Sequence, residues 1–115
     1  MTGWDSVRGF LQPALDHGGN RYTFEDVIAE IEAGEAHLWR FEKSAVVTRF
    51  LDEPAGRTLL YWLAGGDLDE IKQMEPHMTA WGQSQGCTRK MLVGRAGWQR
   101  ALNWKRSAVV LVENI

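Results

Sequence analysis

Apolar residues recur every three to four positions in the first part of the chain, and this spacing predicts two helices. The first stripe covers residues 4–15 and contains Pro13, so this helix should bend or end in a short second turn. The second helix should begin at Thr23, whose hydroxyl can cap the backbone, with Asp26 three residues later completing a capping box. Gly34 is typical of a helix C-terminus and should end it.

Apolar and β-branched runs follow and predict three strands. Residues 37–41 and 45–51 should form a hairpin across a tight turn near Glu42-Lys43. The third run, residues 58–63, is apolar on both faces, and this pattern predicts a strand inside the sheet.

Two glycines, Gly65 and Gly66, end the third strand, and a helical pattern starts directly after them. Asp67 should cap this helix, with Glu70 as its partner three residues later. The apolar stripe continues to residue 81 and is interrupted by Pro76, which predicts a kink.

The rest of the chain predicts a strand at 87–93, a short helix at 98–104 and a closing strand at 107–112. A strand–helix–strand unit of this size should cross over right-handed and place its strands in parallel. The expected order is ααβββαβαβ in one domain, residues 1–115. The predicted fold class is α/β (α+β), with a mixed central sheet of about five strands and helices on both faces.

Composition fits a globular domain that is 44% hydrophobic and 24% charged. Six tryptophans are many for this length; they can fill the core, or one or two can lie on a contact surface. The single Cys87 excludes an internal disulfide, and no basic, apolar leader or membrane-spanning run is visible. These features favour a cytoplasmic protein.

Charge is unevenly distributed along the chain. Residues 1–86 hold seven Lys/Arg and fourteen Asp/Glu, whereas residues 87–112 hold six Lys/Arg and no acid. Such asymmetry can mark a site for an acidic partner or nucleic acid. The alternatives are that the two halves pair across the fold, or that the basic groups form a solvated face.

Several short segments, in this order and at these spacings, resemble the GNAT N-acetyltransferase superfamily, in particular small GNAT-like proteins encoded in phages and prophages. The similarity spans nearly the whole chain and corresponds to a short form without the first strand of the superfamily or its full C-terminal arm. The segments that carry it are Thr23 to Val27, Leu38-Trp39, Ala64-Gly65-Gly66-Asp67-Leu68, Gly86-Cys87 and Gly94-Arg95-Ala96-Gly97-Trp98-Gln99-Arg100.

For an active GNAT enzyme, the resemblance implies acetyl-CoA bound between the strands at 58–64 and 87–93. Its pyrophosphate would rest on backbone N–H groups before the next helix, where free amides and the helix dipole favour an anion. Gly65 and Gly66 would be the cofactor-binding residues of this chain. The family loop has Gln or Arg, two variable residues, Gly, a variable residue, then Gly or Ala; this chain offers only the two glycines.

Charge and missing catalytic groups argue against that activity. Asp67, Asp69 and Glu70 crowd the first helical turn and would repel a pyrophosphate. The 58–64 strand holds no carboxylate that could act as a base, and Tyr61 should pack rather than react. No tyrosine follows residue 61 to serve as the C-terminal acid, so the catalytic residues stay unknown.

Other chemistry has little support. The three histidines are far apart in sequence and, with Cys87, do not have the spacing of a metal site; none is predicted. Arg95, Trp98 and Arg100 could instead form a partner-binding surface with an aromatic anchor and arginine neighbours. The alternative is that Trp98 fills the core and Arg95 holds the loop. Nucleic acid is disfavoured because the overall charge is −2 and no recognition motif is present.

The sequence therefore predicts a phage or prophage protein with a degenerate GNAT fold that binds no cofactor. It would act as a binding, assembly or virion-associated protein, with a phage-particle or host protein as partner and no membrane. One alternative is an active N-acetyltransferase that uses acetyl-CoA. A second alternative is a small module that binds a host protein.

Overall fold

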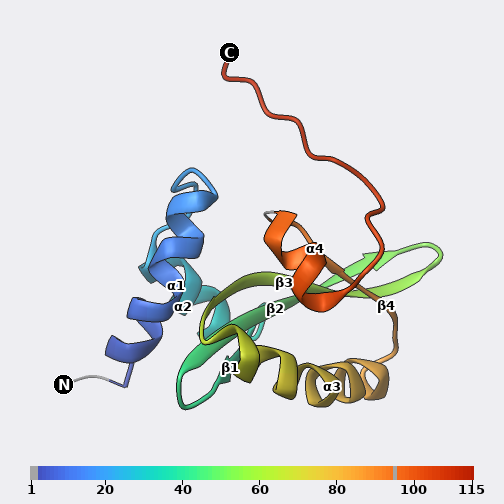
Figure 1. The fold of residues 1–115 in the computed structure, drawn as a ribbon, viewed down its shortest axis with the longest axis horizontal. Coiled ribbons are helices and arrows are strands. Elements are labelled where there is room, and N and C mark those ends of the chain that lie inside the picture. The colour runs from blue at the N-terminus through green and yellow to red at the C-terminus, as the bar shows by residue number, and fades with distance from the viewer. Residues whose placement is uncertain (1–2, 95) are drawn as a thin grey trace.

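A computed structural model describes residues 3–94 and 96–115 of the chain. Within these residues two helices precede a three-stranded antiparallel unit, and a helix, a strand and a short helix follow (Figure 1). The elements are α1 (Asp5–His17), α2 (Phe24–Glu32), β1 (His37–Arg40), β2 (Ser44–Glu53), β3 (Gly56–Gly66), α3 (Leu68–Ser84), β4 (Cys87–Leu92) and α4 (Ala96–Leu102).

The four strands form one mixed sheet in the order β1-β2-β3-β4. β1 pairs with β2 and β2 with β3 in antiparallel fashion, whereas β3 and β4 are parallel. This confirms the predicted change from antiparallel to parallel pairing. The β3–β4 register starts at Arg57↔Cys87 and ends at Tyr61↔Leu92, so residues 62–66 of β3 extend beyond β4.

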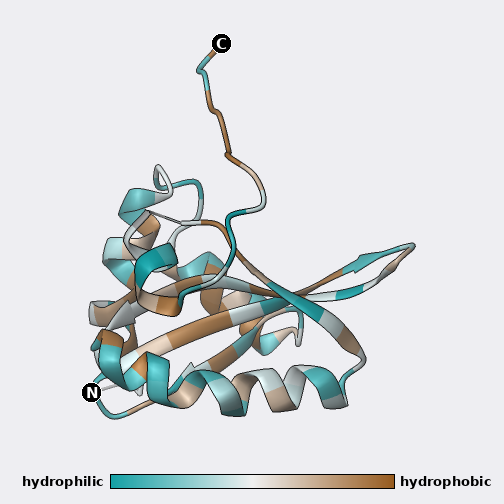
Figure 2. Ribbon diagram, turned by 45° about the vertical axis from the view of Figure 1, so that its right-hand side comes forward, coloured by the Kyte–Doolittle hydropathy of each residue, from teal (hydrophilic) through white to brown (hydrophobic). Residues whose placement is uncertain are grey.

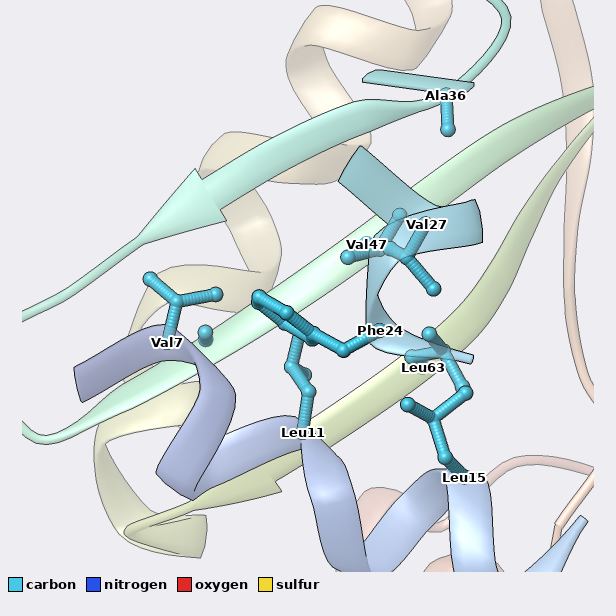
Figure 3. Close-up of a cluster of buried hydrophobic side chains, with 9 residues drawn as sticks. Val7, Leu11, Leu15, Phe24, Val27, Ala36, Val47 and Leu63 are labelled. Carbon is cyan, nitrogen blue, oxygen red and sulfur yellow. The ribbon is translucent and has the colours of Figure 1, made fainter. Parts of the chain in front are cut away.

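Helices cover both faces of the sheet, and alternation along β2 separates the two cores. Val47 faces a cluster built mainly from α1 and α2, with Leu11 and Phe24 fully buried (Figure 3). Val46 faces the opposite cluster, in which Ile71 and Met78 of α3 are buried. Each of the six tryptophans is partly buried and packs against one of the two clusters, as the core-filling interpretation predicts.

The helix ends follow the local chemistry of the sequence. At the start of α2, Thr23 and Asp26 form the expected capping box, with the Thr23 N–H donating to Asp26 Oδ2 at 2.8 Å. Gly34 follows α2 at φ +78°, a conformation that glycine adopts without strain. Both α1 and α3 continue through their prolines, Pro13 and Pro76.

The predicted fifth strand does not form, so the sheet has four strands among the described residues and not five. Residues 107–112 are extended without strand pairing, and the chain beyond α4 leads away from the domain (Figures 1 and 2). Val109, Val110, Leu111 and Val112 are each more than 60% exposed. A β-branched run needs a neighbouring strand and a face to cover before it becomes part of a sheet.

No helix in the part of the chain that the structure describes is long and apolar enough to cross a membrane.

Candidate functional site

The junction between β3 and α3 is where the sequence places its candidate anion site. β3 ends at Gly66, Asp67 is the N-cap, and α3 begins at Leu68. The Asp67 carboxylate accepts a hydrogen bond from the Glu70 N–H at 3.1 Å, as the sequence predicts for a cap. The Asp67 N–H donates to the Lys43 carbonyl at 2.9 Å. Two of the amides at this junction are therefore already bonded within the protein.

The Glu70 side chain departs from the expected pairing. It does not return to the backbone of its cap residue but reaches the β1–β2 turn. There it accepts hydrogen bonds from the Lys43 N–H at 2.9 Å and from the Ser44 hydroxyl. Glu70 thus links the first turn of α3 to the β1–β2 hairpin. Lys43 and Ser44 precede Glu70 by 27 and 26 positions, and helix-cap rules do not predict contacts over this separation.

Close backbone packing explains both glycines at the junction. A Cβ on Gly65 would lie 2.8 Å from the carbonyl carbon of Phe10 and closer still to its oxygen, because α1 crosses β3 at this point. Gly66 has φ +105°, and a Cβ there would lie 2.6 Å from the Ser44 Cα. Neither position tolerates a side chain, so the pair is required by the fold whether or not a phosphate binds.

A second polar cluster, which sequence reasoning missed, lies between α3 and the β3–β4 pair. Glu75 forms an ion pair with Lys90 and accepts hydrogen bonds from the Thr79 hydroxyl at 2.9 Å and the Tyr61 hydroxyl at 3.4 Å. Trp104 covers the cluster, with its ring 5.4 Å from that of Tyr61 and 4.8 Å from Lys90 Nζ. The only sequence signal is the i, i+4 spacing of Glu75 and Thr79 on α3.

Burial governs the chemistry of this cluster. Tyr61 is 3% exposed, and desolvation raises the pKa of its hydroxyl far above the ordinary range. The Thr79 hydrogen bond lowers this pKa, and the Glu75 charge raises it further. Tyr61 therefore stays protonated at neutral pH, as a core residue with a satisfied hydroxyl.

The acidic and basic parts of the sequence meet across this region of the fold. Lys90 pairs with Glu75, and Arg89 pairs with Glu53 at 3.0 Å. Arg89 also donates to the Thr58 hydroxyl at 2.7 Å. For these two residues the interpretation that the halves pair across the fold is confirmed.

The predicted partner surface of Arg95, Trp98 and Arg100 lies partly outside the described residues. Arg95 lies outside the described residues. Trp98 is partly buried against the α3-side core, and a Cβ on Gly94 would lie 3.0 Å from its Cδ1. Arg100 is exposed on α4. The structure thus gives Trp98 a packing role and leaves Arg100 at the surface.

Neither the Cys87 thiol nor a group of metal-ligating side chains forms a further candidate site among the described residues. Burial raises the pKa of the Cys87 thiol, although the Arg57 guanidinium opposes the shift, so the thiolate is disfavoured. Within residues 3–94 and 96–115, no group of three or more His, Cys, Asp or Glu side chains could hold a metal ion.

Comparisons with known proteins show the fold alone. No family model matches the sequence, and the search of curated proteins gave no match. Among solved structures, the chain is similar to TTHA1254 from Thermus thermophilus, with a TM-score of 0.59. The two are 12% identical, and the match covers 100% of this chain and 93% of that chain.

Proposed function

We propose that this protein is a non-catalytic member of the GNAT-like fold, a phage or prophage protein that acts by binding in particle assembly or as a virion component. The observation that carries the non-catalytic part is the state of the α3 N-terminus. The Asp67 carboxylate caps the helix through the Glu70 N–H, the Glu70 carboxylate binds the β1–β2 turn, and Gly65 and Gly66 are required by close backbone packing. The phage setting rests on the resemblance of the sequence motifs.

Electrostatics supports the same proposal. A pyrophosphate placed against Gly66 and Leu68 would meet the carboxylates of the N-cap Asp67 and of Asp69 and Glu70 in the first turn of α3. Each carboxylate stabilises the helix by about 0.3–1 kcal/mol and opposes a second anion at the same amides. The residues that strengthen the helix therefore weaken its use as a phosphate site.

The internal cluster also supports a non-catalytic role. An acetyl-transfer base or acid needs access to the substrate and a pKa near the working pH. Tyr61 is buried with a raised pKa, and the Glu75 side chain is 12% exposed and forms an ion pair with Lys90. Trp104 packs against Tyr61 and Lys90 on the α4 side of the cluster.

Calorimetry with acetyl-CoA tests the proposal against its main alternative, an N-acetyltransferase. We expect no saturable heat with the unchanged protein at millimolar ligand. Binding tighter than about 100 μM, some −5.5 kcal/mol, would overturn the proposal. The variant Leu68→Glu then serves as a control, because Leu68 begins α3 and is 39% exposed, so the added charge opposes a phosphate without meeting the tight backbone contacts of Gly66. Loss of that binding would place the cofactor at the junction.

Co-sedimentation with purified phage particles tests the binding role. The unchanged protein should sediment with particles, and Arg100→Glu should reduce this if the surface around α4 makes the contact. Arg21→Glu is the matched control, since it makes the same charge change on an exposed residue between α1 and α2. Absence from particles, with recovery of one defined protein from host lysate, would favour the second alternative, a host-protein-binding module.

A further inference from the structure

Residues 107–115, here called the arm, combine strand-like composition with high exposure. The run Ala108-Val109-Val110-Leu111-Val112 contains no charge, and its large side chains range from 63% to 89% exposed. Among the described residues, none forms a backbone hydrogen bond with the arm. β-branched apolar runs of this kind are stable in water only when another strand and an apolar face cover them.

The edge of β4 supplies what the arm lacks. β4 pairs with β3 on one side, and among the described strands none pairs with its other side. This open edge spans six residues, Cys87–Leu92, the same length as the segment 107–112. β1, the other edge strand, has only four residues.

A hollow beside β4 shows where side chains of an added strand would go. It has a volume of about 210 Å³ and lies between the second half of α3 and β4, lined by Leu59, Gly82, Cys87 and Lys90 among others. Gly82 itself packs closely on Leu59, so that a Cβ there would lie 3.0 Å from Leu59 Cδ2, and the hollow lies beside this contact. Valine or leucine side chains from a fifth strand would fill this gap in the α3-side core.

The direction of the arm indicates that the strand comes from a second copy. Trp104, three residues before the arm, packs against Tyr61, which pairs with Leu92 at the end of β4. This contact places the start of the arm close to the open edge. From this point the chain leads away from its own sheet in both views (Figures 1 and 2). Each copy therefore offers a free strand and a free edge, and two copies can satisfy each other reciprocally.

We propose that the arm adds as a fifth strand to β4 of a second copy of this chain and so forms a strand-exchanged dimer. Backbone hydrogen bonds along the edge give the affinity, and the hollow beside α3 receives alternate side chains of the arm. The proposal stands apart from the proposed function, because it uses neither the α3 N-terminus nor any ligand.

Sedimentation velocity over a concentration series tests the exchange. The unchanged protein should reach twice its 13.0 kDa mass as its concentration rises to about 100 μM, which as a dissociation constant corresponds to about −5.5 kcal/mol. The double variant Val109→Pro, Val110→Pro should stay monomeric, because one of any two adjacent residues must donate to the neighbouring strand and proline cannot. Val109→Ile, Val110→Ile is the matched control and should still dimerise.

Hydrogen exchange on the same samples shows whether the arm of a second copy, the arm of the same copy or neither pairs with the edge of β4. Dimerisation with protection of amides 108–112 that appears only at dimer-forming concentrations supports the proposal. A monomer with protected arm amides would show that the arm folds back on its own β4 and would overturn it. A monomer with unprotected amides at every concentration would leave the edge to another partner and would also overturn it.

Discussion

The carbonyl group of Phe10 in α1 lies against Gly65 in β3 so closely that no Cβ fits between the two backbones. This contact positions α1 across the end of β3, on the face of the sheet opposite α3. The glycine that marks a phosphate loop in the sequence is thereby a packing residue in the fold.

Gly65→Ala should therefore destabilise the protein strongly. The added methyl group meets backbone, which cannot rotate away, so we expect a loss of about 3 kcal/mol or more in the free energy of unfolding. Urea denaturation measures this loss. Gly9→Ala, in the exposed face of α1 with nothing within 4 Å of its Cβ, is the control and should add about 0.5–1 kcal/mol. A Gly65→Ala variant as stable as the unchanged protein would contradict the packing explanation.

The Glu75–Lys90 pair should behave as a coupled, partly buried unit. Glu75→Leu or Lys90→Met alone should cost about 1–3 kcal/mol, because each leaves a shielded charge without its partner. The double variant should cost less than the two single variants together, by about 1 kcal/mol or more. Urea denaturation of the four proteins gives this difference, and strict additivity would show that the pair contributes nothing.

His37 should make stability depend on pH. Its ring lies 4.7 Å from Phe50 and 4.8 Å from Trp81, and burial lowers its pKa below the ordinary 6.5, against a hydrogen bond with the Thr48 backbone that raises it. As the pH decreases through about 6.5, His37 is protonated in the unfolded chain before it is protonated in the folded protein. Neutral, buried His37 therefore contributes fully to the free energy of unfolding above this pH, and its contribution decreases at lower pH.

Thermal unfolding between pH 5 and pH 8 checks this dependence. The stability difference between the unchanged protein and His37→Gln should narrow as the pH falls below 6.5. His77→Gln removes an exposed histidine from α3 and serves as the control. A difference between the unchanged protein and His37→Gln that stays constant across the range would count against the buried ring.

The capping box at the start of α2 should contribute measurably to the free energy of unfolding. Thr23→Ala removes the acceptor for the Asp26 N–H, which lies 3.1 Å from the Thr23 hydroxyl, and should cost about 1 kcal/mol. Thr23→Ser keeps the hydroxyl and should cost much less. Equal losses in the two variants, measured by urea denaturation, would assign the effect to the methyl group and not to the cap.

Local signals in the sequence predicted those elements whose causes are local. The Thr23 cap and Gly34 bound one helix, and the strands of the hairpin follow from their own residue pattern. The segment 107–112 has equally strong strand propensity but no pairing in the structure, because strand formation depends on a neighbour that the sequence does not identify. Its prediction as a closing strand of the sheet was wrong for that reason.

The candidate site shows the same limit. The cap formed by Asp67 is a local feature and was predicted. The partners of the Glu70 carboxylate, Lys43 and Ser44, lie 27 and 26 positions earlier in the chain and were not. The contact of Gly65 with Phe10 and the pairing of Glu75 with Lys90 also join distant parts of the chain. Such contacts arise only when the sheet and its helices assemble.

Amide chemical shifts during a titration with acetyl-CoA test the central claim, that the β3–α3 junction is closed to a nucleotide. The amides of Gly65, Gly66, Leu68 and Asp69 should keep their positions in ¹⁵N–¹H spectra up to about 1 mM ligand, which corresponds to less than about 4 kcal/mol of binding. Saturable shifts confined to these four amides would show a phosphate on the backbone there and would contradict the account.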